Sequence, residues 1–136
     1  MTTTQSIPVR VYIEDTDAGG IVYYVNYLKF MERARTEFMR GFDYRHYALG
    51  DAGFQFVVQS CQVRYHRPGR VDDLLTVSAE LVKLGKASLV FSQRVERDTE
   101  LLCEAEVRVG CIANESHKPA AMPADLYQRV KKETGL

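Results

Sequence analysis

The residues best suited to chemistry lie in the stretch 14–40, where a polar turn with two glycines runs into a strongly patterned helix. The turn holds two carboxylates, Asp15 and Asp17. A carboxylate can act as a general base or as a nucleophile. The start of a helix offers unpaired backbone N–H groups, which stabilise a developing oxyanion. A carboxylate that faces a helix start therefore predicts an active site at this junction.

The same turn also allows a purely structural interpretation. Aspartates in turns commonly cap nearby backbone N–H groups, and on the residues alone this role competes with a reacting role for Asp17. Asp15 is expected to be the structural aspartate of the pair. Gly19 and Gly20 permit backbone conformations that are closed to other residues, or a close approach of substrate to the backbone.

A long helix over residues 27–40 must position this junction. Its apolar stripe has the spacing i, i+3, i+4, i+7, i+11 and comprises Tyr27, Phe30, Met31, Ala34 and Phe38. The polar residues of the helix, Arg35 among them, are mostly off this stripe. Asn26 is expected to be the N-cap, and Gly41 fits the C′ position that ends the helix.

The rest of the chain alternates with the period of β-strands. Strands are expected at residues 7–13, 54–67, 74–84, 87–97 and 103–111. In the first strand one face is expected to carry Ile7, Val9, Val11 and Ile13, and in the second Val57, Cys61, Val63 and Tyr65. Residues 1–6 are expected to be frayed, residues 43–50 to form a short helix, and residues 124–132 to form a final helix with Pro123 at its first position.

This order of elements indicates an α+β fold in one domain, residues 1–136. We expect one long central helix wrapped by a curved antiparallel β-sheet.

The composition is that of an ordinary globular domain and argues against several classes of function. Eighteen Lys and Arg balance eighteen Asp and Glu, so no basic field favours nucleic acid. The cysteines are scattered, and no Cys/His cluster has zinc spacing, so we expect free thiols, no metal and no cofactor. No apolar run approaches the roughly 20 residues of a membrane helix. The sequence therefore favours a cytoplasmic protein that is not membrane-spanning.

Several segments carry a resemblance to a known family. They read VRVYIEDTDAGGIVYY at 9–24, YLKFMERARTEFMR at 27–40, VRYHRPGRVDDLL at 63–75, SLVFSQRV at 88–95 and EAEVRV at 104–109. Together they cover nearly the whole chain. The sequence resembles the hotdog-fold thioesterases of the 4-hydroxybenzoyl-CoA thioesterase family, and within it the acyl-CoA thioesterases associated with the Tol-Pal system.

The resemblance implies hydrolysis of acyl-CoA to free acid and CoA. It implies that Asp17, the second aspartate of DTD, is the catalytic carboxylate, and that the backbone N–H of Tyr24 points at the thioester carbonyl. Little further machinery is needed, because the conjugate acid of the leaving thiolate has a pKa near ~8.5 by analogy with cysteine. Tyr24 departs from the Tol-Pal-associated branch, where histidine is common, and resembles the 4-hydroxybenzoyl-CoA enzyme. An aromatic acyl group therefore stays open beside an aliphatic one.

The resemblance also implies homodimers with their sheets joined side by side, usually paired into tetramers, and an active site built from two subunits. Coenzyme A carries phosphates, so a chain without net charge needs local cations. Arg67 and Arg70 are the candidates, against the alternative of a solvated strand end. Gly19 and Gly20 are candidates for substrate approach, and acyl carrier protein is a further candidate partner.

Two other functions remain open on the sequence. The first is a non-catalytic scaffold that binds acyl-CoA or acyl carrier protein and is linked to the cell envelope. The second is a hotdog dehydratase, whose usual His-centred site has no clear counterpart here.

Overall fold

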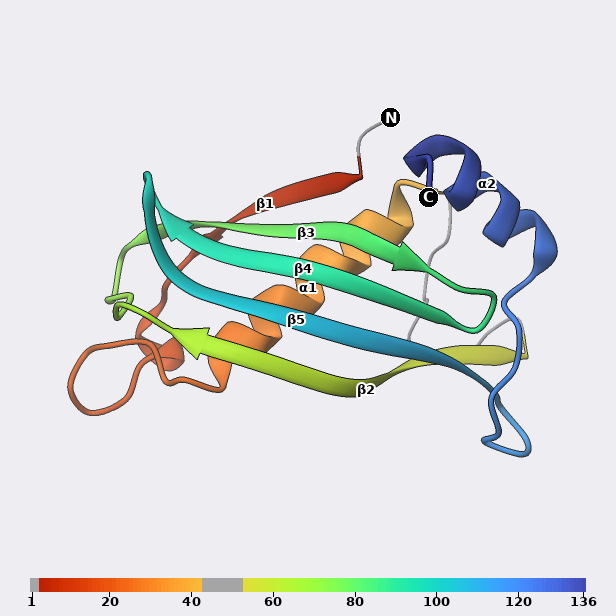
Figure 1. The fold of residues 1–136 in the computed structure, drawn as a ribbon. Helices are drawn as coiled ribbons and strands as arrows, with labels where there is room; N and C mark the ends of the chain where they lie inside the picture. Colours follow the sequence, from red (N-terminus) through yellow and green to blue (C-terminus); the bar gives the residue numbers. More distant parts are fainter. Residues whose placement is uncertain (1–2, 43–52) are drawn as a thin grey trace.

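The computed structural model describes residues 3–42 and 53–136 of the chain. Five antiparallel strands form one sheet in the order β1-β3-β4-β5-β2, and a long helix crosses one face of it (Figure 1). The strands are β1 (Thr4–Arg10), β2 (Phe54–Tyr65), β3 (Leu74–Leu84), β4 (Ser88–Arg97) and β5 (Glu100–Ala113). The helical elements are the 3-10 turn η1 (Ile13–Asp15), α1 (Asn26–Arg40) and α2 (Ala124–Thr134). The short helix expected at residues 43–50 lies outside the described residues.

Helix α1 is the central element, as predicted. All members of its apolar stripe are buried, none more than 4% exposed: Tyr27, Phe30, Met31, Ala34 and Phe38. Burying one large side chain of this kind stabilises the fold by about 1.5–3 kcal/mol. The stripe packs on strands β1, β3 and β4. No helix in the described part of the chain is both long and apolar enough to cross a membrane.

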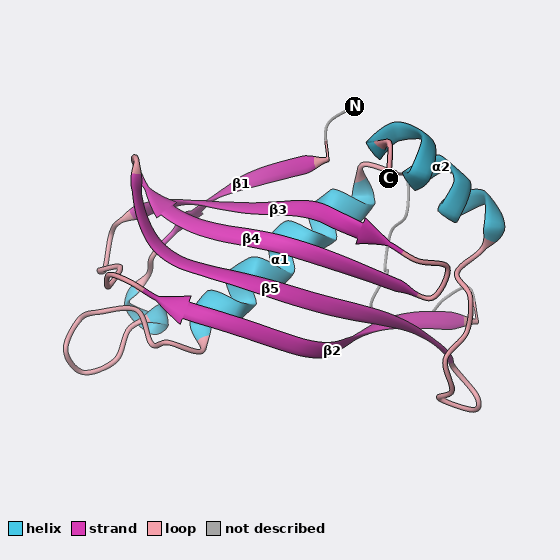
Figure 2. Ribbon diagram, in the orientation of Figure 1, coloured by secondary structure: helices cyan, strands magenta, loops and turns pink. Residues whose placement is uncertain are grey.

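The sheet offers α1 a continuous apolar face. Alternate residues of β3, β4 and β5 point inward as expected, and the buried set includes Leu75, Val77, Leu81, Leu89, Phe91, Val95, Val107 and Val109. Helix α2 lies at the end of the sheet, close to the turn between β3 and β4 (Figure 2). The Met122 N–H donates to the Lys86 carbonyl at 2.9 Å and ties the segment before α2 to that turn. The expected architecture, a helix against a curved antiparallel sheet, is confirmed.

Strand β2 departs from simple alternation. Its pairing with β5 shifts between Val58 and Ser60, which marks a β-bulge with one extra residue. Val57 pairs with Gly110 whereas Cys61 pairs with Val107, so the two lie on opposite faces of the sheet. The expectation that Val57 shares a face with Cys61 is therefore wrong. The buried positions before the bulge belong instead to Phe54 and Phe56.

Strand β1 begins and ends earlier than expected. Thr4 and Ser6 pair with β3, so residues 4–6, which were expected to be frayed, are part of the sheet. Ile13 is 74% exposed and lies outside the strand. The reason is local: the Tyr12 N–H donates to Asp15 Oδ2 at 2.9 Å, which turns the chain into η1.

The helix ends also differ in detail from the sequence expectation. Asn26 is the first residue of α1, and Val25 takes the N-cap position. Gly41 is the C-cap with a φ of −62°, in the right-handed region, so it does not form the expected C′ turn. Pro123 is the N-cap of α2 rather than its first residue, and α2 continues to Thr134.

Candidate active site

The loop between η1 and α1 folds into a small hairpin that projects beyond the end of the sheet (Figure 1). The Tyr23 N–H donates to the Asp15 carbonyl at 2.9 Å, and the Asp17 N–H donates to the Ile21 carbonyl at 2.9 Å. Gly20 closes the tip with a φ of 78°, which glycine adopts without strain. The hairpin therefore presents Asp17 on a fixed backbone.

Asp17 is exposed at the hairpin tip. Its Oδ1 accepts a hydrogen bond from the Gly19 N–H at 2.9 Å, which is the turn-capping role that the sequence allows. A Cβ at position 19 would lie 3.3 Å from that oxygen, so glycine keeps the space beside the carboxylate open. No hydrogen bond joins the carboxylate to Tyr24 within the described residues of one chain. Turn capping occupies one carboxylate oxygen and leaves the other available.

Asp15 holds the hairpin against the helix. Its Oδ2 accepts from the Tyr12 N–H at 2.9 Å, and its Oδ1 accepts from the side-chain amide of Asn26 at 3.3 Å. The same amide reaches the Asp15 carbonyl at 3.3 Å. Asp15 therefore has the structural role expected of it.

The start of α1 presents free backbone donors. The N–H groups of Tyr24 and Val25 have no hydrogen-bond partner among residues 3–42 and 53–136. The Tyr24 carbonyl, in contrast, accepts from the Tyr65 hydroxyl of β2 at 3.1 Å. The ring of Tyr65 lies 6.0 Å from that of Tyr24 and 5.7 Å from that of Tyr27, centroid to centroid. This aromatic cluster fixes the start of α1, and the backbone N–H groups of Tyr24 and Val25 remain available to polarise a carbonyl.

A pocket of about 230 Å³ opens beside this helix start. It is lined by Ile21, Val22, Tyr24, Tyr27, Tyr65, His66, Arg67 and Pro68. Tyr27 is 3% exposed and its hydroxyl accepts from the Gly69 N–H at 2.8 Å. Burial raises the pKa of Tyr27, so its hydroxyl stays neutral. Tyr27 and Tyr65 therefore shape the pocket, whereas the sequence pattern marks them only as packing residues.

The two candidate phosphate-binding arginines lie on either side of this region. Arg67 lines the pocket, is 64% exposed, and its Nη1 lies 3.2 Å from Glu100 Oε2. Arg70 is exposed beside the hairpin, where its backbone forms a bridge with Ile21. The structure thus brings Arg67 to the pocket with Tyr24, and Arg70 to the hairpin that carries Asp17.

An ion-pair network supports the turn that carries both arginines. Arg97 Nη1 lies 2.8 Å from Asp73 Oδ2, and Arg97 also contacts Glu100. Burial alone would raise the pKa of Asp73, but the hydrogen bonds from Arg97 and from the Arg70 N–H outweigh it and hold that pKa below its usual value. The network therefore fixes this turn with charged groups that stay ionised.

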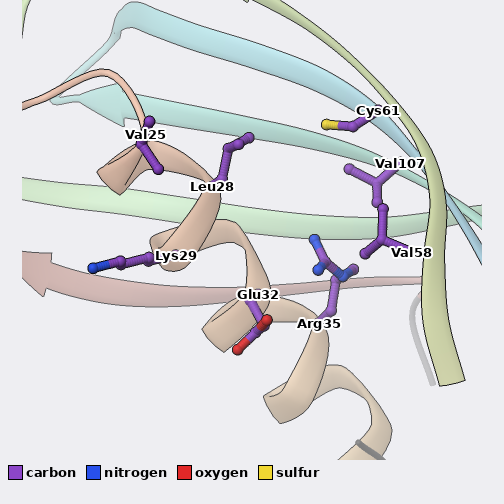
Figure 3. A pocket seen from close by; sticks show the side chains of 8 residues that line it. All are labelled: Val25, Leu28, Lys29, Glu32, Arg35, Val58, Cys61 and Val107. Carbon is purple, nitrogen blue, oxygen red and sulfur yellow. The ribbon is translucent and has the colours of Figure 1, made fainter. Parts of the chain in front are cut away.

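A second pocket, of about 200 Å³, lies between α1 and the sheet. Figure 3 shows Val25 and Leu28 near the start of the helix and Arg35 further along it, with Val58, Cys61 and Val107 on the sheet side. Arg35 is only 4% exposed and donates to Gln93 Oε1 at 2.8 Å. The sequence pattern counts Arg35 among the residues mostly off the buried stripe, whereas the structure buries it against Gln93. The sequence does hold one sign of a buried partner for such a group, because Gln93 is a polar residue among the inward positions of β4.

Comparison with known proteins gives consistent results. A curated relative, the acyl-CoA thioester hydrolase YbgC of Escherichia coli O157:H7, is 44% identical over 132 residues, which span 96% of this chain and 98% of the relative. The structure of a probable thioesterase from Bartonella henselae superposes with a TM-score of 0.82 at 32% identity, covering 88% of this chain and 99% of that one.

A thioesterase from Thermus thermophilus, solved in complex with coenzyme A and Zn, superposes with a TM-score of 0.81 at 26% identity. The match covers 97% of this chain and 95% of that one. These neighbours confirm the hotdog architecture. Residues 11–130 match the family model of the thioesterase-like superfamily, and the chain belongs to that family.

Proposed function

We propose that this protein is a thioester hydrolase that converts acyl-CoA to the free acid and CoA. The proposal rests on the N–H groups of Tyr24 and Val25, which have no partner within residues 3–42 and 53–136 and lie beside a 230 Å³ pocket at the start of α1. The family, and a 44% identical relative named as an acyl-CoA thioester hydrolase, support the same reaction. The helix start supplies the electrostatic stabilisation that such a reaction needs.

Asp17 supplies the carboxylate in one of two ways. As a general base it takes a proton from water, whose oxygen then adds to the thioester carbon. As a nucleophile it adds to that carbon itself, and water hydrolyses the resulting anhydride. In both cases the carbonyl electron pair moves onto the oxygen facing the helix N–H groups, the C–S bond breaks, and CoA leaves as a thiolate that solvent protonates.

The complete site is proposed to need two subunits. Asp17 stands on a projecting hairpin, and no hydrogen bond joins it to Tyr24 among the described residues of its own chain. Strand β2 is twelve residues long and lies at an edge of the sheet, where a strand of a second copy can pair with it. A homodimer joined through β2, itself paired into a tetramer, brings the helix start of one subunit towards the hairpin of its partner.

The CoA portion is proposed to lie along the turn at residues 67–70. Arg67 at the pocket and Arg70 beside the hairpin are placed to meet its phosphates. Gly19 and Gly20 leave room for the substrate to approach the backbone. Acyl carrier protein, which presents acyl groups through the same thioester chemistry, is a further candidate donor, and a cytoplasmic location fits both.

Release of free thiol from a panel of acyl-CoAs, from short aliphatic to long-chain and benzoyl, tests the proposal. Asp17→Asn should lower kcat by about 100- to 10,000-fold, since it removes the base or nucleophile. Asp98→Asn is the matched control, because Asp98 is exposed in the turn between β4 and β5, and asparagine tolerates its positive φ equally well. The control should match wild type.

Each alternative outcome has a distinct meaning. Equal activity of Asp17→Asn and wild type would mean that the protein is a thioesterase whose base or nucleophile is not Asp17. If wild type releases thiol from no acyl-CoA and from no acylated acyl carrier protein, the enzyme proposal is wrong. The alternative, an acyl-binding scaffold linked to the cell envelope, is then favoured.

The shared site has its own test. Asp17→Asn and Tyr24→Pro each disable one half of the site, the second by removing the backbone N–H. A mixed dimer of the two variants should regain turnover if the carboxylate and the N–H come from different subunits. A mixed dimer as inactive as its parents contradicts the two-subunit arrangement.

A further inference from the structure

The guanidinium of Arg35 is a buried charge without a carboxylate partner. Its side chain is 4% exposed, and none of the ion pairs among the described residues includes it. Its Nε has no hydrogen-bond partner among those residues. A buried charge is costly unless it is paired and hydrogen-bonded. Arg35 therefore has unused capacity to bind an acceptor, and an anion would suit it best.

Gln93 fixes the direction in which Arg35 points. Its side chain is fully buried, and its Nε2 donates to the Met31 carbonyl at 2.9 Å and to the Ser78 carbonyl at 3.2 Å. Its Oε1 is thereby aimed at Arg35 Nη1, at 2.8 Å. A guanidinium carries five donors in a rigid fork. Holding one arm with Gln93 sets the plane of the fork and leaves the Nε edge unpaired.

Arg35 lines the 200 Å³ pocket as well as lying in the protein interior. Figure 3 shows it pointing into the space between α1 and the strands that carry Val58 and Val107. The walls between the helix start and Arg35 are mostly apolar: Val25, Leu28, Val58 and Val107. An apolar channel that ends at a fixed cation favours a ligand with an apolar middle and an anionic end.

The pocket begins where the proposed reaction takes place. Val25 lines it and follows Tyr24 directly. Ten residues of helix separate Val25 from Arg35, or about 15 Å along the axis, and the Arg35 side chain leans back towards the helix start. An acyl group whose thioester carbonyl lies at the free N–H groups would therefore extend its far end towards Arg35.

We propose that Arg35 is a specificity residue that binds a carboxylate at the far end of the acyl group, so that the preferred substrates are CoA monothioesters of short dicarboxylic acids. This inference rests on the proposed thioesterase function. A cavity of about 150 Å³ is enough for benzene, so the 200 Å³ here suits an acyl group of roughly six carbons. The planar fork of a guanidinium matches the two oxygens of a carboxylate.

Two other charged residues line the same pocket. Lys29 adds a second positive charge, and Glu32 adds a negative one, both from exposed positions on α1. In Figure 3 the Glu32 carboxylate points away from the guanidinium of Arg35. The end of the pocket at Arg35 therefore keeps its positive character.

The test compares three substrates of equal chain length: adipoyl-CoA, its ω-methyl ester and hexanoyl-CoA. Wild type should show a kcat/KM for adipoyl-CoA at least about tenfold above that for the ester, the discrimination expected of a charge-assisted hydrogen bond. Arg35→Met should abolish this ratio, and Arg35→Lys should keep only part of it, because lysine supplies charge without the fork. Arg33→Met, on the exposed side of the same helix, should leave the ratio unchanged.

The inference is overturned if wild type hydrolyses all three substrates equally, or if Arg35→Met retains the wild-type ratio. If Arg35→Met does not fold, the ratio of kcat/KM for adipoyl-CoA to kcat/KM for its ester in wild type tests the inference by itself. Failure of the proposed function looks different, since wild type would then release thiol from none of the three. Calorimetric binding of adipoyl-CoA against hexanoyl-CoA to wild type would still decide on Arg35 in that case, and equal affinity would refute the carboxylate site.

Discussion

Removing Gln93 should destabilise the protein mainly through Arg35. Gln93→Leu takes away the acceptor of a guanidinium that is 4% exposed and leaves that charge without its one protein partner among the described residues. Leaving such a group unsatisfied costs about 3 kcal/mol of unfolding free energy. Arg35→Met removes the charge instead and leaves only the neutral Gln93 oxygen unpaired, at about 1–2 kcal/mol.

The double variant Gln93→Leu with Arg35→Met separates this cause from lost packing. Independent effects would add to about 4–5 kcal/mol. We expect about 2 kcal/mol less than that sum, because replacing both partners leaves neither an unpaired guanidinium nor an unpaired Gln93 oxygen. The loss of the Gln93 donor to the Met31 and Ser78 carbonyls is common to Gln93→Leu and the double variant, so it cancels in the coupling. Urea unfolding followed by circular dichroism, with all four proteins compared at one pH, measures this coupling free energy.

An exposed pair on the same helix supplies the control. Glu37 and Arg40 lie 3.3 Å apart with side chains 43% and 50% exposed. The matching cycle with Glu37→Ala and Arg40→Ala should give a coupling of about 0.5 kcal/mol or less. A coupling this small for Gln93 and Arg35 as well would refute the argument that the buried guanidinium depends on Gln93.

Three further predictions follow from other contacts. Under native conditions one equivalent of a thiol reagent should modify the exposed Cys61 and not Cys103, which is buried and whose pKa is raised by burial to about 12. Peptide mapping identifies the labelled residue. The adduct should inhibit turnover, because Cys61 lines the pocket beside α1. Tyr65→Phe should lower kcat more than stability, since it frees the Tyr24 carbonyl at the helix start while an exposed hydroxyl contributes about 0.5–1 kcal/mol; an unchanged kcat would contradict the positioning role. The lowered pKa of Asp73 means that its contribution to stability is present above its ordinary pKa of 3.8 and is lost as pH falls through the lower folded-state value; urea midpoints at about pH 5 and pH 3 should therefore converge between wild type and Asp73→Asn at the lower pH.

The long elements of the fold could be predicted because their residues repeat with one period over many positions. The stripe of α1, from Tyr27 to Phe38, holds the helical period throughout and is buried throughout. The inward residues of β3 alternate from Leu75 to Leu81, and the strand ends where expected, at Leu84. In such segments local periodicity and burial against the core specify the same structure, so one sequence is enough.

The parts that could not be predicted depend on strand pairing and on side-chain hydrogen bonds, which periodicity does not encode. Whether residues around Val58 contain a bulge depends on how β2 pairs with β5, and alternation alone cannot show that. Ile13 fits a strand by its type, but the Asp15 carboxylate captures the Tyr12 N–H and ends the strand. The Asn26 side chain donates a hydrogen bond to the Asp15 carboxylate, so it does not cap the start of α1.

Some residues of the candidate site could be predicted from the sequence and others could not, for the same reasons. Asp17 and Tyr24 could be named because the turn and the helix start are contiguous in sequence and resemble a family motif. Arg35 could not, because its burial depends on Gln93, 58 positions away in the chain. A polar residue in an inward strand position was the available warning, since buried polar groups almost always have a partner.

The bulge in β2 makes the strand tolerate the loss of one residue at one place only. The pairing with β5 skips Gln59, and the strand packs Phe54 and Phe56 inward before this residue and Val63 inward after it. Deleting Gln59 would leave both halves on their present partners in an unbroken ladder. A deletion elsewhere in β2 would instead shift the residues between it and the bulge by one position and turn their side chains over. A deletion scan along β2 should therefore find Gln59 to be the best tolerated position.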